Sequence, residues 1–310
     1  MTSNDTSRRG RVVMVTNHKG GVGKTSNTLS LAAALAKKGR KCLLIDFDGE
    51  PTLSEMLRAP TSKAWPSAFE FITQSVDEPE TYDPLDFVIT DETPDVTLPQ
   101  NLHLIPGSKR IENFHDWMLR NKFLILQKVL EGPFERLRAS YDYIFIDTPP
   151  RTSDATVAAM FVTDFVVLST FPQSASVRRL VSALEDFKKA KLQGGATLEP
   201  IGIIMCAVKQ PRTVLAKHLT KRLVDAFRFE HDDSTMKFSE DIVQAVAFDE
   251  AWEMGQTIFD YAPDHQICSQ YFAVADELEA RIAARSDYEL VPKTRPELVA
   301  DLPEEVAANA

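Results

Sequence analysis

The chain has 310 residues, of which 44% are hydrophobic and 26% are charged, and its formal net charge at pH 7 is −10. This composition can build a large soluble domain, and the acidic balance argues against a uniformly basic nucleic-acid-binding protein. No apolar run reaches the roughly 18 residues of a membrane-spanning helix, and the short run after the polar N-terminus does not fit a signal peptide. We therefore expect a cytoplasmic protein without a membrane segment.

Short β-branched runs alternate with helical stretches, which is typical of a doubly wound α/β fold: a mostly parallel sheet flanked by helices. We predict strands at 11–16, 41–46, 102–106, 143–147, 165–170 and 201–207. We predict helices at 24–38, 52–57, 68–74, 122–140, 154–161, 174–191, 213–227 and 264–285.

Charge and proline content divide the chain further. Acidic residues outnumber basic ones in 58–100 and again in 286–310, so the rest of the chain is close to neutral and can carry a local basic patch. We predict a flexible N-terminus (1–10), a single domain (11–285) with an acidic surface excursion at 58–100, and an acidic, disordered tail (286–310). The scattered cysteines Cys42, Cys206 and Cys268 fit core positions better than a metal site or a disulfide.

A glycine-rich segment, Asn17-His-Lys-Gly-Gly-Val-Gly-Lys-Thr-Ser26, lies between the first strand and the first helix. That position suits phosphate binding, because glycines let backbone N–H groups turn inward and a helix N-terminus adds positive potential. We expect Lys24 to contact the β- and γ-phosphates and the Thr25 hydroxyl to bind Mg²⁺. The literal pattern G-x-x-x-x-G-K-[ST] is not met, since His18 holds its first glycine position. A turn that only connects strand and helix is the alternative.

The run Lys19-Gly-Gly-Val-Gly-Lys24-Thr25 resembles the deviant Walker A motif of the ParA/MinD family of dimeric ATPases, in which a signature lysine precedes the glycines. The resemblance implies a P-loop fold, ATP and Mg²⁺ as cofactors, and a homodimer formed with ATP. It also implies that Lys19 reaches the nucleotide of the other subunit. The nucleotide-binding residues that it implies are Lys19, Gly20, Gly21, Val22, Gly23, Lys24, Thr25 and Ser26.

Two strand ends resemble further motifs of the family. Leu43-Leu-Ile-Asp46-Phe-Asp48 resembles its D-x-D strand, which implies that Asp46 lies near Mg²⁺ and that Asp48 orients the attacking water. Tyr143-Ile-Phe-Ile-Asp147-Thr-Pro-Pro150 resembles Walker B and the second switch, which implies that Asp147 holds Mg²⁺ through a bound water. The implied catalytic residues are thus Lys19, Lys24 and Asp48, and the implied metal ligands are Thr25, Asp46 and Asp147. The resemblance runs from Arg11 to about Leu278.

Among the branches of the ParA/MinD family, the sequence is most similar in its features to the small ParA-type partition ATPases. A MinD-type membrane anchor would be a basic amphipathic helix, whereas residues 286–310 are acidic and contain prolines. Iron–sulfur relatives need suitably placed cysteines, and larger plasmid ParA proteins need an extension before the first strand. The resemblance then implies slow ATP hydrolysis stimulated by a ParB-like partner, nonspecific DNA binding, nucleoid association, and partition of plasmid or chromosomal DNA.

Nonspecific DNA binding would depend on Lys and Arg contacts to phosphates. The candidates, which could equally form solvated helix faces, are Arg178, Arg179, Lys188, Lys189, Lys191, Lys209, Arg212, Lys217, Lys221 and Arg222. Two other functions share the same active-site residues: ATP-driven positioning of a protein cargo, and a nonhydrolysing nucleotide-dependent interaction module. The second is kept because the loop after Asp48 reads Gly49-Glu-Pro-Thr52 in place of the family's Pro-Gln-Gly-Asn.

Overall fold

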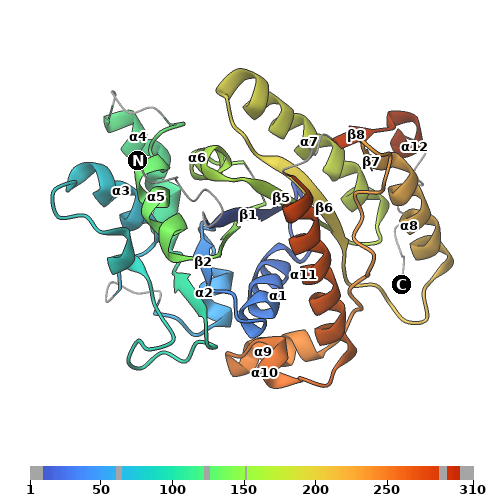
Figure 1. Cartoon of the computed structure of the whole chain (residues 1–310), viewed down its shortest axis with the longest axis horizontal. Helices are drawn as coiled ribbons and strands as arrows, with labels where there is room; N and C mark the ends of the chain where they lie inside the picture. Colours follow the sequence, from blue (N-terminus) through green and yellow to red (C-terminus); the bar gives the residue numbers. More distant parts are fainter. Residues whose placement is uncertain (1–9, 61–64, 122–125, 151, 286–291, 301–310) are drawn as a thin grey trace, which may run out of the picture.

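Six strands form a parallel central sheet in the order β3-β2-β4-β1-β5-β6 (Figure 1). The computed structural model describes residues 10–60, 65–121, 126–150, 152–285 and 292–300. The strands are β1 Arg11–Thr16, β2 Cys42–Asp46, β3 Leu102–Ile105, β4 Tyr143–Asp147, β5 Phe165–Thr170 and β6 Glu199–Met205. Every strand residue is buried except the half-buried Arg11, as expected for a parallel sheet covered on both faces. The predicted fold class is confirmed.

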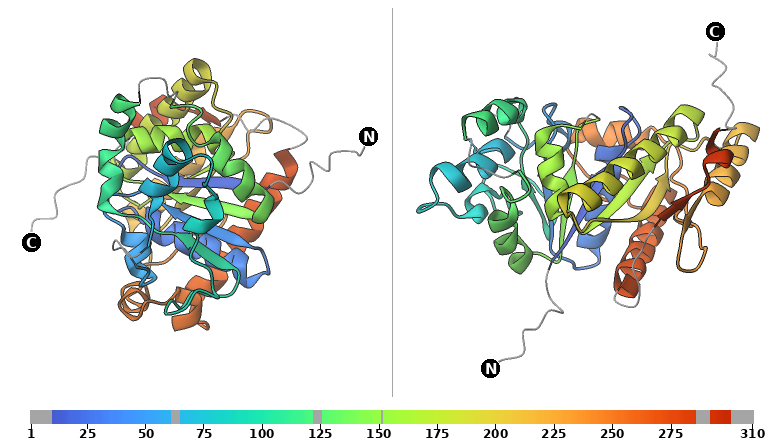
Figure 2. Two further views of the ribbon diagram at one scale, coloured as in Figure 1. Left: turned by 90° about the vertical axis from the view of Figure 1, so that its left-hand side faces the viewer. Right: turned by 90° about the horizontal axis from the view of Figure 1, so that it is seen from above.

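Helices cover both faces of this sheet (Figures 1 and 2). Helices α1 and α11 pack together on one face, while α5, α6 and α7 pack in sequence on the other. Among the described residues, no helix is both long and apolar enough to span a membrane. The helices are α1 Lys24–Lys37, α2 Thr52–Met56, α3 Ala68–Asp77, α4 Phe114–Arg120, α5 Glu131–Ser140, α6 Asp154–Val162, α7 Ser174–Gly194, α8 Val214–Ala226, α9 Ala247–Met254, α10 Ile258–Tyr261, α11 Gln266–Ala284 and α12 Pro296–Ala300, with 3-10 turns η2 Pro84–Phe87 and η3 Lys109–Asn113.

Two predicted elements differ from the structure for local reasons. The helix predicted at 122–140 begins only at Glu131, after turns at 126–130; residues 122–125 lie outside the described part. Pro133 explains this, because proline is accepted in the first turn of a helix but disrupts its interior. The strand predicted at 201–207 runs from Glu199 to Met205. It ends early because Ala207 has φ +53°, outside the strand conformation.

The acidic segment predicted as a surface excursion packs against the free edge of β3. Phe71 and Ile72 of α3 and Phe87 of η2 are buried. Ile89 exchanges two backbone hydrogen bonds with Leu104 of β3, at 2.8 and 2.9 Å. This segment therefore covers an edge that would otherwise expose unpaired backbone groups. Figure 2 shows α3 and α4 at this end of the sheet and α8 and α12 at the opposite end.

Part of the expected tail is ordered. Residues Pro292–Thr294 form β8, which pairs antiparallel with β7 (Phe227–Phe229), and α12 packs against α8 and α7. Asp233 forms ion pairs with Lys293 and Arg295, so the basic residues of this acidic segment anchor it to the domain. For residues 292–300 the expectation of disorder is corrected; 286–291 and 301–310, like 1–9, lie outside the described residues.

Candidate nucleotide-binding site

The glycine-rich loop lies at the carboxyl edge of the sheet, between the end of β1 and the start of α1. Gly21 and Gly23 have φ of +68° and +76°, in the left-handed region that favours glycine. A Cβ atom on Gly23 would also lie 3.0 Å from the sulfur of Cys206. The loop can therefore keep this shape only with glycine at these positions, and it places the first N–H groups of α1, with their positive potential, at the opening.

Lys24 is held inside the site. Its side chain is 7% exposed, and its Nζ lies 3.5 Å from the carbonyl oxygen of Lys19. Burial lowers the pKa of Lys24, and the carboxylates of Asp147 and Asp48 oppose that shift. The ammonium group thus lies among backbone and acidic groups at the opening of the loop, where it could contact an anionic ligand.

The three expected metal ligands come together because β2 and β4 are neighbours. Asp46 and Asp147 are partners in the register of these strands, and the Thr25 hydroxyl donates to Oδ2 of Asp147 at 2.7 Å. Burial raises the pKa of both carboxyl groups; Asp147 raises that of Asp46 further, whereas the Thr25 hydrogen bond and Lys24 act against the shift at Asp147. Two adjacent buried carboxylates and a hydroxyl fit Mg²⁺, which usually takes one or two carboxylates and completes its shell with water and substrate phosphates.

The described residues contain no cluster of three or more His, Cys, Asp or Glu side chains suited to a metal. Two carboxylates and a hydroxyl leave coordination positions of a Mg²⁺ ion for water and nucleotide phosphates. Asp46 accepts hydrogen bonds from the Ser54 amide and hydroxyl at 3.1 and 2.7 Å and from the Asp48 amide at 3.1 Å. Asp48 is half-buried, and burial raises its pKa. The switch-like loop after β2 is thus fastened to the buried Asp46.

Lys19 contacts its own subunit in this structure. Its Nζ donates to the Gln173 side-chain oxygen at 2.8 Å and to the Ser176 hydroxyl at 3.1 Å. Both acceptors belong to the start of α7 or the residue before it. The lysine that was expected to act across a dimer interface is therefore held against α7 by two neutral groups.

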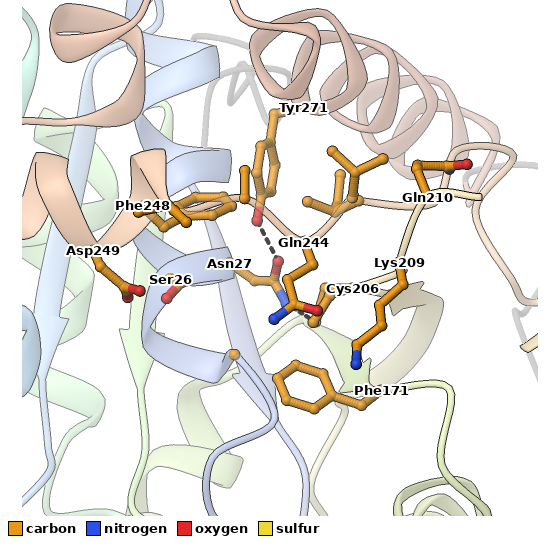
Figure 3. Close-up of a pocket in the computed structure, with 16 residues that line it drawn as sticks. Ser26, Asn27, Phe171, Cys206, Lys209, Gln210, Gln244, Phe248, Asp249 and Tyr271 are labelled. Carbon is orange, nitrogen blue, oxygen red and sulfur yellow. Dashed lines mark hydrogen bonds between the residues drawn. The ribbon is translucent and has the colours of Figure 1, made fainter. Parts of the chain in front are cut away.

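A cavity of about 520 Å³ opens beside the start of α1 (Figure 3). Its polar groups include the Gln244 amide and the Tyr271 hydroxyl, which donates to Asn27 at 2.6 Å, and Phe171 lies at its edge. The lining residues are Gly23, Ser26, Asn27, Phe171, Cys206, Ala207, Lys209, Gln210, Ile242, Val243, Gln244, Ala245, Val246, Phe248, Asp249 and Tyr271. Sequence reasoning predicted Gly23 and Ser26 as nucleotide-binding residues but missed the others. The available signal was position, since 171 and 206–209 follow β5 and β6 at the edge where ligands bind in such sheets.

The basic residues proposed for DNA do not form one uniform group. Arg179, Lys188, Lys189, Lys217 and Lys221 are exposed, while Arg178, Lys191 and Arg222 are half-buried. Lys209 lines the cavity, and Arg212 lies 2.8 Å from the carboxylate of Asp241. These last two are also exposed, and they differ from the helix-surface candidates in lying at the cavity and its wall.

Comparison with known proteins agrees with this geometry. The family model described as an AAA domain (AAA_31) matches residues 10–199. The sporulation initiation inhibitor protein Soj of Bacillus subtilis is 25% identical over 272 residues, which cover 87% of this chain and 99% of Soj. An ATP complex of McdA from Cyanothece has a TM-score of 0.70 at 19% identity, covering 91% of this chain and 99% of that one.

MinD of Pyrococcus horikoshii, complexed with Mg-ADP, has a TM-score of 0.64 at 20% identity and covers 90% of this chain and 100% of MinD. These two structures support the fold, and the family model together with the relatives supports the resemblance drawn from the motifs. The chain belongs to the ParA/MinD family of Walker A ATPases, with an AAA_31 domain at its core.

Proposed function

We propose that this protein binds Mg-ATP at the carboxyl edge of its sheet and hydrolyses it as a ParA-type switch. The observation that carries the proposal is the joint placement of Lys24, Thr25 and Asp147: the buried lysine lies beside the carboxylate, to which the threonine hydroxyl donates at 2.7 Å. Structural neighbours complexed with ATP or with Mg-ADP are consistent with this cofactor pair.

In this proposal the chain contributes position and charge. Lys24 and the amides of the glycine loop hold the phosphates, and Thr25, Asp46 and Asp147 would hold Mg²⁺, which neutralises developing phosphate charge. Asp48 accepts a hydrogen bond from the attacking water and so orients its oxygen toward the γ-phosphorus. The oxygen–phosphorus bond to ADP breaks as the bond to water forms, and the water proton leaves with inorganic phosphate. Little covalent chemistry is left for the protein, so turnover should be slow without a partner.

The cavity beside α1 is the place for the nucleoside. It adjoins Gly23 and Ser26, so a nucleotide whose phosphates lie on the loop would extend its base into it. An aromatic ring (Phe171) and amide groups (Asn27, Gln244) are the kind of lining that orients a base. We assign adenine and ribose to this cavity.

Dimerisation would redirect Lys19. The side chain would leave Gln173 and Ser176 and reach the phosphates bound by the partner subunit, so that ATP favours the dimer and hydrolysis releases it. The exposed basic residues on the helix surfaces are candidates for nonspecific contact with DNA phosphates: Arg179, Lys188, Lys189, Lys217 and Lys221. Relatives named as chromosome-partitioning proteins support a partition role with a ParB-like stimulator.

The test combines hydrolysis with DNA binding. Gel shifts on random duplex DNA should occur with ATP and be absent with ADP or without nucleotide. Release of phosphate from ATP should be measurable when DNA is present. Asp48→Ala should lower turnover while ATP binding is retained. If Asp48→Ala hydrolyses ATP as fast as the parent, the role of Asp48 is contradicted. DNA binding that does not depend on nucleotide would contradict the switch. No DNA binding in any nucleotide state would favour a protein cargo.

A further inference from the structure

One wall of the nucleotide-side cavity consists of two paired segments beyond the end of β6. The Ile242 amide donates to Met205 at 2.9 Å, and Val208 and Gln244 each donate across the pair at 3.0 Å. Residues 207, 209 and 210 line the cavity from one segment, and residues 242–246 line it from the other. The width of the cavity therefore depends on how these two short segments are held together.

A buried ion cluster joins the segments just outside the cavity. Asp241, whose side chain is 2% exposed, precedes the second segment and lies 2.8 Å from Nη2 of Arg212, which follows the first. Its other oxygen lies 2.6 Å from Nζ of Lys237, which is 6% exposed and also donates to the Phe238 carbonyl at 2.7 Å. Arg212 is the one member that reaches from the first segment to the second, and it is 37% exposed.

We propose that Asp241, Arg212 and Lys237 form a clasp that positions the nucleoside-binding wall, so that Arg212 contributes to nucleotide affinity. This inference rests on the proposed function, since it takes the cavity to hold the nucleoside of ATP. Arg212 is a positioning residue: it acts through residues 207–210 and 242–246 and touches no nucleotide itself.

The physical reason is preorganisation. With the clasp closed, the cavity wall is ordered before a ligand arrives. Without Arg212, the first segment loses its ion pair to the second and is held there by backbone hydrogen bonds and apolar contacts, so part of its ordering is added to the cost of binding. Asp241 keeps Lys237 as its partner, so the chain should still fold. Arg212 pairs with Asp241 and not with a residue of the phosphate loop, so its loss should affect binding of the phosphates less than binding of the nucleoside.

The experiment compares ligands that use the two halves of the site differently. Calorimetric titration should show that Arg212→Ala weakens ATP and ADP binding about tenfold, while Mg²⁺-tripolyphosphate, which has no nucleoside, binds as it does to the parent. Arg212→Lys should recover part of the nucleotide affinity, because a cation again faces Asp241. Arg120→Ala is the matched control: it removes the same side chain from an exposed position on α4 and should leave ATP affinity unchanged.

Three results would overturn the proposal in distinguishable ways. Parental ATP affinity in Arg212→Ala would show that the clasp does not position the wall. Equal losses for ATP and tripolyphosphate would show a general disturbance of the site. A loss of ATP-dependent DNA shift in Arg212→Ala, with ATP affinity intact, would return Arg212 to the DNA surface. Failure of the parent chain itself to bind ATP would instead refute the proposed function, and the clasp's role with it.

Discussion

Replacing Asp46 by asparagine should stabilise the metal-free protein at pH 8 while weakening its response to Mg²⁺. Asp46 is completely buried, and its neighbour in the register of the adjacent strand is Asp147. Burial and the second carboxylate raise the pKa of Asp46 above its value in an unfolded chain. The folded state therefore binds more protons than the unfolded state in the interval between these two pKa values. Stability must fall as the pH rises through that interval.

The magnitude follows from the spacing of the strands. Charges on adjacent strands about 5 Å apart repel by ~3 kcal/mol at an effective dielectric constant of about 20. An asparagine removes this repulsion, but it replaces one acceptor oxygen by an NH₂ group and so gives up one of the hydrogen bonds from Ser54 or Asp48, worth about 1 kcal/mol. The net gain at pH 8 should be ~1–2 kcal/mol, or roughly 2–5 °C in Tm.

Thermal unfolding in EDTA at pH 5 and pH 8 measures this effect. Asp46→Asn should melt higher than the parent at pH 8, the gain should shrink at pH 5, and Mg-ADP should stabilise the variant less than the parent. Asp86→Asn is the control, because it removes one negative charge from an exposed site and tests whether lower net charge alone raises Tm. An equal or lower Tm for Asp46→Asn at pH 8, or the same gain in Asp86→Asn, would refute the reasoning.

Three further substitutions test other contacts. Lys24→Gln should weaken ATP binding about 100-fold in an equilibrium titration, as expected for removal of a buried phosphate-facing charge, and parental affinity would contradict its role. Gly107→Ala would place a Cβ 2.6 Å from the carboxyl carbon of Asp46. Thermal unfolding should therefore show a free energy of unfolding lower by about 1–3 kcal/mol. Gly132→Ala is the control and should cost nothing, because its Cβ would have no atom within 4 Å. Arg138→Ala breaks a buried bidentate ion pair and should cost about 3–5 kcal/mol in urea unfolding, against less than about 1 kcal/mol for the exposed Arg136→Ala.

The central fold could be predicted because its signals are local. Each strand of the sheet is an apolar run, and each is buried on both faces, so periodicity and burial agree. The misses are elements whose stability comes from distant partners. Strands β7 and β8 have three residues each and exist through pairing with one another across about 60 residues of chain. Residues 292–300 carry too little apolar periodicity to reveal this, and their ion pairs with Asp233 are tertiary.

The site divides in the same way. The phosphate loop and the acidic strand ends are contiguous motifs, and the parallel register of β2 and β4 brings Asp46 and Asp147 together as neighbours. The cavity, in contrast, is assembled from α1, the ends of β5 and β6, the segment before α9, and α11. Phe171, Gln244 and Tyr271 carry no motif, and only the positions of strand ends pointed toward part of this set. The ion pair between Arg212 and Asp241 was likewise invisible in the sequence, because only the fold brings these two residues together.

The contacts of Lys19 make the proposed switch energetically reasonable. Its two hydrogen bonds in the single chain go to the neutral oxygens of Gln173 and Ser176, and such bonds contribute about 0.5–1.5 kcal/mol each. A phosphate oxygen is a charged acceptor, and hydrogen bonds to it are roughly twice as strong. Transfer of Lys19 from α7 to a nucleotide on a second subunit should therefore be favourable only when that nucleotide presents phosphate charge within reach. With ADP the γ-phosphate is missing, and the contacts to Gln173 and Ser176 again compete. The same lysine can thus hold the free subunit in one state and join the dimer in the other.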